Sequence, residues 1–150
     1  MSETERLAEQ LHRALAGGAW HGASWQEILA GLPRQARVAF KRALERPIPG
    51  AHSIAEIVLH TATWLDVVRR RLGGESPQVS SLEDWPPADF PDEAAWSAAA
   101  ARMRETGREL CDGIRRFPAE RLPERRPGLD DTWYGLIAGE LQHVLYHAGQ

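Results

Sequence analysis

The segment from residue 53 to residue 72 constrains the fold most, because it has the marks of a long helix with one apolar face. Ser53 and Glu56 stand three residues apart at its start, which is the spacing of a capping box. Residues suited to a core then recur at intervals of three and four, as they do along a helix packed in a bundle. These residues are Ile54, Val58, Thr61, Leu65, Val68 and Leu72. Gly73 and Gly74 end the pattern, so other helices must cover this face.

Other parts of the chain carry similar helical patterns. Long helices are predicted at residues 3–16, 92–117 and 131–150, and shorter ones at 24–32 and 34–45. The proline-rich stretch "ESPQVSSLEDWPPADFP" separates the second and third long helices, and it is long enough to cross the end or side of a bundle. We therefore predict an all-α fold, a four-helix bundle with one long crossover, formed as a single domain by residues 1–150.

Composition and charge narrow the class of protein. The chain is 43% hydrophobic and 26% charged, which is ordinary for a globular domain. A domain of this length can bury a core without a stabilising metal, so a metal here would be functional. Its net charge of −3 argues against nucleic-acid binding. The run Arg69-Arg70-Arg71 is most simply the solvated end of a helix, where cations suit the helix dipole.

The single cysteine, Cys111, permits neither a disulfide nor a cysteine-based zinc site, and it fits a reducing compartment. The polar start "MSETERLAEQ" does not resemble a secretory signal, and no apolar run approaches the length of a membrane span. From these features we expect a cytoplasmic protein that does not associate with membranes.

Two histidines near the end of the chain have the geometry of metal ligands. His143 and His147, in "HVLYH", are four residues apart and would lie on one face of the last helix. The glutamate of the H-E-x-x-H motif is missing, which disfavours a zinc protease. A third ligand should come from another helix, and His60, in the middle of the 53–72 segment, is the best candidate. A histidine such as His60 can equally be a hydrogen-bonded core residue.

Glu140 and Gln150 share the face of the histidine pair and are candidates for contacts with a ligand or with substrate. Glu140-x-x-His143 is also half of a di-iron carboxylate pattern. However, Glu56 lies four residues from His60 instead of three, and the other helices offer no convincing bridging glutamates, so a di-iron site is disfavoured. We expect Glu140 to orient a histidine or bind substrate, with a solvated surface glutamate as the plain alternative.

The set of candidate pocket residues is completed by aromatic residues, one further histidine and Glu56, which lies four residues before His60. Trp64 lies one turn beyond His60 and would wall a substrate pocket. Trp20 and His21 lie in a glycine-rich segment, and we expect them at the mouth of such a pocket.

These segments together resemble the DinB/YfiT-like superfamily. The resemblance rests on "PIPGAHSIAEIVLHTATWLDVVRRRLGGE", on "GELQHVLYHAGQ" and on the lead-in "AWHGASWQEILAGL". It implies a four-helix bundle with up-down-down-up order and one divalent metal ion, zinc or nickel, bound by three histidines. By the match these are His60, His143 and His147, with Gln150 beside the metal pocket.

The resemblance also implies a class of activity. Related enzymes use mycothiol, bacillithiol or glutathione, some to transfer the thiol to an electrophile and one type to isomerise maleylpyruvate, and others are described as metal-dependent hydrolases. The expectation is a metal-dependent transferase or hydrolase acting on a small electrophilic substrate, with a low-molecular-weight thiol as cosubstrate. The nucleophile would be a thiol or water activated by the metal, and Cys111 is not implied in this role. The alternative is a non-catalytic helical module, such as a dimerising stress-response protein with a vestigial pocket; a homodimer fits either function.

Overall fold

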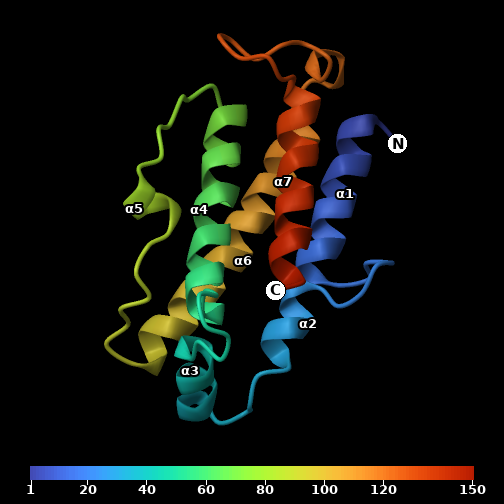
Figure 1. Cartoon of the computed structure of the whole chain (residues 1–150). Coiled ribbons are helices and arrows are strands. Elements are labelled where there is room, and N and C mark those ends of the chain that lie inside the picture. Colours follow the sequence, from blue (N-terminus) through green and yellow to red (C-terminus); the bar gives the residue numbers. More distant parts are fainter.

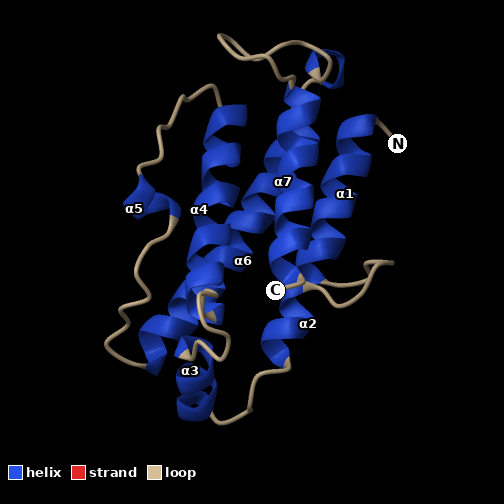
Figure 2. Cartoon of the chain, in the orientation of Figure 1, coloured by secondary structure: helices blue, strands red, loops and turns tan.

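The computed structural model describes residues 1–150, and it consists of helices and loops without a β-strand (Figure 2). The long helices are α1 (Glu3–Ala16), α4 (Ile54–Leu72), α6 (Glu93–Arg116) and α7 (Trp133–Ala148). The short elements are α2 (Trp25–Ala30), α3 (Ala36–Leu44), α5 (Ser81–Asp84) and the 3₁₀ helix η1 (Ala119–Arg121). The predicted all-α class is confirmed, and the long helices begin and end within about two residues of their predicted limits, the usual uncertainty of helix ends.

Several helices begin where a serine precedes a glutamate by three residues. In α1, α2, α4 and α5 the serine hydroxyl accepts a hydrogen bond from the backbone N–H of that glutamate, and the carboxylate accepts one from the serine N–H. Each such capping box satisfies two N–H groups that the first helical turn leaves without partners. Local sequence therefore fixes where these helices start, including α4, which carries the apolar seam described above.

The long helices form a bundle in which α6 packs against α1 and α4, and α7 packs against the same two helices. Figure 1 shows that α1 and α7 run in one direction while α4 and α6 run in the other, in agreement with the up-down-down-up order. Because α4 and α6 are parallel, the chain must return along the bundle between them. The segment 73–92, which we call the crossover, does so along the side of α4 and contains α5 (Figure 1).

The core lies between the four long helices, and every one of them contributes to it. The predicted seam of α4 is buried at Val58, Thr61, Leu65 and Val68, each no more than 2% exposed. At one point α1 and α6 approach closely because Gly107 has no side chain: a Cβ atom there would lie 2.6 Å from Cδ1 of Leu15. This glycine therefore sets the spacing of the two helices.

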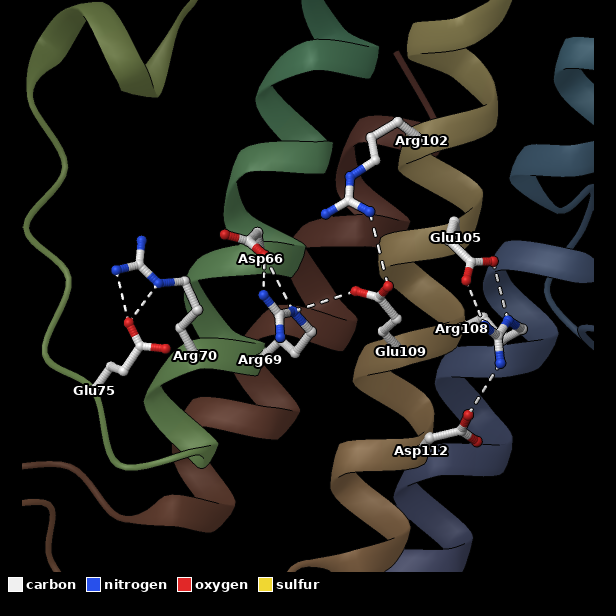
Figure 3. Close-up of polar contacts among 9 residues, drawn as sticks. All are labelled: Asp66, Arg69, Arg70, Glu75, Arg102, Glu105, Arg108, Glu109 and Asp112. Atoms are coloured by element: carbon white, nitrogen blue, oxygen red, sulfur yellow. Dashed lines mark hydrogen bonds and ion pairs between the residues drawn. The ribbon is translucent and has the colours of Figure 1, made fainter.

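On the outer face, charged side chains of α4 and α6 form a row of ion pairs (Figure 3). The Arg69 guanidinium lies 2.6 Å from Asp66 on its own helix and 3.5 Å from Glu109 on α6. Such partly exposed pairs contribute little to stability individually. None of the helices combines the length and the apolar character that a membrane span requires.

Candidate metal centre

The fold brings His60, His143 and His147 together, and we call these three residues the histidine cluster. His60 comes from the middle of α4, while His143 and His147 lie one turn apart near the end of α7. One ring nitrogen from each residue can be chosen so that all three lie within 4.8 Å of one another. In a tetrahedral zinc site, ligand nitrogens at the usual Zn–N distance are about 3.3 Å apart. The cluster is therefore a candidate site for one metal ion.

Hydrogen bonds to the far side of two rings determine which nitrogen is available. Nδ1 of His60 lies 2.6 Å from the backbone carbonyl oxygen of Asp84, and Nδ1 of His147 lies 2.6 Å from Oε1 of Gln150. Both oxygens can only accept, so each Nδ1 donates its proton, and the lone pair of each neutral imidazole is on Nε2. Nε2 of His60 is also only 2.9 Å from Nε2 of His143, so the lone pair faces the centre of the cluster.

Burial favours the form of the histidines that binds metals. His60 is 5% exposed and His147 is 7% exposed. Burial lowers the pKa of His60, although the Asp84 carbonyl partly opposes this effect. Burial, opposed by the hydrogen bond to Gln150, also lowers the pKa of His147, to about 4. Both imidazoles are therefore neutral at neutral pH, as metal coordination requires.

The carboxyl group of Glu140 lies beside the Nδ1 atom of His143. This Nδ1 lies 3.5 Å from Oε2 of Glu140, which comes one turn earlier on α7 and is 5% exposed. Burial raises the pKa of Glu140, and the neighbouring His143 opposes this shift. Nδ1 of His143 and Oε1 of Glu140 are both buried without a hydrogen-bond partner. A carboxyl group at this position suits the role of orienting an imidazole ligand.

The crossover supplies two neighbours of the cluster that sequence reasoning missed. Besides its carbonyl contact with His60, Asp84 accepts a hydrogen bond from Nε1 of Trp64 at 2.7 Å. The ring of Trp85 stacks between two imidazoles, with its centre 3.9 Å from that of His60 and 3.6 Å from that of His52. The Ser80/Glu83 capping box could have predicted α5, but nothing in the sequence predicts that its end reaches α4.

A cavity of about 450 Å³ lies beside the cluster, between α4 and α7. His60, His143 and Glu140 line it at one end, and Trp64 forms part of its wall, which is where the sequence predicts that residue. Gln150 is placed against His147, outside this cavity.

Three other residues predicted at the pocket are not brought to the histidine cluster. Trp20 is fully exposed in the loop after α1, and His21 beside it is also exposed, because the glycine-rich segment turns outward instead of folding over the bundle. Glu56 is held at the start of α4 by the Ser53 N–H and the Arg46 guanidinium. Its nearest imidazole is that of His52, at 3.8 Å.

Another tryptophan near these residues has a structural role that the sequence analysis did not identify. Trp25 is buried at the start of α2, and its Nε1 donates a hydrogen bond to the Val144 carbonyl at 3.0 Å. Val144 lies between His143 and His147, so α2 holds the part of α7 that carries both histidines. The Ser24/Glu27 capping box predicts the helix but not what its first residue contacts.

Comparison with known proteins agrees with this geometry. The family model described as the DinB superfamily matches residues 19–150, which include α2 to α7 and all three residues of the histidine cluster. Comparisons with curated proteins and with solved structures gave no match. The match covers most of the chain, and we conclude that the chain belongs to the DinB superfamily.

Proposed function

We propose that this protein is a metal-dependent enzyme that binds one divalent ion, zinc or nickel, through His60, His143 and His147. The observation that carries the proposal is the arrangement of the three imidazoles. Two of them are buried with Nδ1 committed to a hydrogen bond, which leaves the lone pair on Nε2, and the ligand atoms of all three lie within 4.8 Å of one another. Three imidazoles and an open fourth position are typical of catalytic zinc sites.

A divalent ion bound there would supply Lewis-acid chemistry, lowering the pKa of a water or thiol that it coordinates. The chain's own residues would prepare the site. Asp84 and Gln150 hold the rings of His60 and His147 in the correct tautomer, and Glu140 lies behind His143. Trp85 covers one face of the His60 ring and keeps water from it. The cavity beside the cluster provides space for a small substrate.

The nucleophile would come from solution, as a low-molecular-weight thiol or water. Cys111, the only cysteine, is 1% exposed on α6, and burial raises the pKa of its thiol to about 11. A thiol with such a pKa is protonated at neutral pH and is a poor nucleophile. Together with the resemblance to thiol-using enzymes, this favours attack of an external thiol on a small electrophile, with hydrolysis as the second form of the same chemistry.

Metal content tests the first part of the proposal. Protein prepared without a nickel column should contain, or take up, about one divalent ion per chain, measured by elemental analysis. His60→Ala and His147→Ala should lose it, while His12→Ala, which changes an exposed histidine of α1, should keep it. Less than about 0.1 ion per chain, with no uptake of added zinc or nickel, would contradict the proposal.

Turnover tests the second part. The metal-loaded protein should conjugate a fluorogenic haloalkyl electrophile to glutathione, mycothiol or bacillithiol faster than the uncatalysed reaction. His143→Ala should not accelerate it, and His12→Ala should behave like the unchanged protein. A full complement of metal without acceleration, and without hydrolysis of activated esters, would instead favour the non-catalytic module.

A further inference from the structure

The three consecutive arginines at the end of α4 have different surroundings. Arg69 is paired with Asp66 and Glu109, and Arg70 is paired with Glu75 at 2.7 Å (Figure 3). Arg71 has no ion-pair partner. Because successive helical residues point about 100° apart, the third arginine of the run cannot share the direction of the first. It turns toward α7 and lines the cavity beside the histidine cluster.

The acidic groups nearest to Arg71 attract its charge but make their closest contacts with other residues. Asp131, on the same cavity wall, is paired with Arg126, and Glu140 lies against His143. An arginine remains charged at neutral pH, and a partly buried charge without a partner costs free energy that a bound anion can offset. The Arg71 guanidinium is therefore available to a ligand.

Trp64 connects this guanidinium to the histidine cluster. The Arg71 guanidinium carbon lies 5.8 Å from the centre of the Trp64 ring, and that centre lies 6.1 Å from the centre of the His143 ring. A molecule with one aromatic ring or a short carbon chain spans such a separation. The α7 wall leaves room for it, because a Cβ atom added to Gly139 would meet no atom within 4 Å.

We propose that this cavity binds small carboxylates, with Arg71 paired to the carboxylate, Trp64 against the apolar part and the far end directed at the histidine cluster. A guanidinium offers two parallel N–H donors that match a carboxylate. Because Asp84, Asp131 and Glu140 also line the cavity, its single arginine suits a monoanion better than a phosphate dianion. Binding of the carboxylate requires no metal. Only the statement that the bound carboxylate is the substrate rests on the proposed function.

Benzoate is a suitable probe. It should be titrated into chelator-treated protein and into zinc-loaded protein, and binding should be followed by calorimetry and by the indole NMR signal of Trp64. We expect binding that Arg71→Gln weakens about tenfold or more, the loss of one charge-assisted pair. Arg70→Gln, which removes the same charge one residue earlier, should bind normally. Benzamide, without the charge, should bind as weakly as benzoate binds to Arg71→Gln. Gly139→Leu, which fills the cavity but keeps Arg71, should also lose binding.

Several outcomes would overturn the inference. These are equal benzoate affinity in Arg71→Gln and unchanged protein, no benzoate binding at millimolar concentrations, tighter binding of inorganic phosphate, or binding that requires zinc and disappears in His143→Ala. Failure of the proposed function is distinguishable from these results. A protein that takes up no metal yet binds benzoate through Arg71 supports the inference, whereas a protein that takes up metal and ignores benzoate contradicts it.

Discussion

At the scale of single residues, the hydrogen bond from His147 to Gln150 should control metal affinity. Gln150→Ala removes the acceptor that holds Nδ1 of His147 protonated and its ring in place. Loss of such a supporting contact typically weakens metal binding by about 10–100-fold. Gln142→Ala is a matched control, because Gln142 is an exposed glutamine of α7, the helix that carries His147. Competition with a chromophoric chelator measures both variants, and equal zinc affinities would show that Gln150 has no supporting role.

The lowered pKa of His147 predicts how the metal-free protein responds to acid. In the unfolded chain His147 titrates near 6.5, whereas in the folded chain burial lowers its pKa to about 4. Between these values the unfolded state binds more protons, so stability is complete above about pH 6.5 and falls as the pH drops toward 4. Moving from about pH 7.5 to pH 5 should cost about 2 kcal/mol through this residue.

Urea unfolding of chelator-treated protein at the two pH values measures this loss. The His147→Gln variant lacks the titrating group, and its loss of stability over the same interval should be smaller by about the same amount. An equal loss in the variant and the unchanged protein would show that other groups dominate the acid response.

Individual residues also show what sequence reasoning can and cannot find. The histidine cluster is predictable because its members are chemically distinctive and two of them share a helix face. Asp84 and Trp85 are not, because they lie in a proline-rich segment without periodicity, and their positions depend on how that segment folds back along α4. Trp20 illustrates the converse: a large aromatic residue beside glycines resembles a pocket residue but is exposed to solvent.

At the scale of elements, the packing of α1 against α6 depends on one glycine. Gly107→Ala places a methyl group 2.6 Å from Leu15 Cδ1 and should force the side chain or the helix to shift. Gly113→Ala, six residues later on α6, meets no atom within 4 Å and should gain the higher helix propensity of alanine. We expect the first variant to be less stable than the second by about 1–3 kcal/mol in urea unfolding. Similar stabilities would mean that Leu15 repacks freely.

The limits of most helices were predictable because their starts depend on local side chains. The capping boxes at Ser2, Ser24 and Ser53 act over three residues, so the sequence alone specifies them. Contacts between elements that are distant in the sequence depend on the packing of the whole bundle instead of on neighbouring residues. The bond from Trp25 to the Val144 carbonyl joins residues 119 positions apart, and it exists only because the whole bundle positions α2 beside α7.

At the scale of the whole molecule, metal binding should change how stability is distributed along the chain. The end of α7 is held by Trp25 on one side and, through the proposed metal, by α4 on the other. Removing the metal should therefore raise amide hydrogen exchange from Val144 onward more than in α1, which has no residue in the histidine cluster. Unchanged exchange in that segment would show that packing alone holds it.

The order of the histidine cluster along the chain has a consequence for how the protein matures. His60 and His143 are separated by 83 positions and meet only after the crossover has placed α6 and the chain has returned as α7. Synthesis proceeds from the N-terminus, so a growing chain displays His60 long before either of its partners exists. A nascent chain thus offers the proposed metal only one ligand of this set, so loading would require the folded protein. The proposed metal would then stabilise molecules that have already folded instead of guiding their folding.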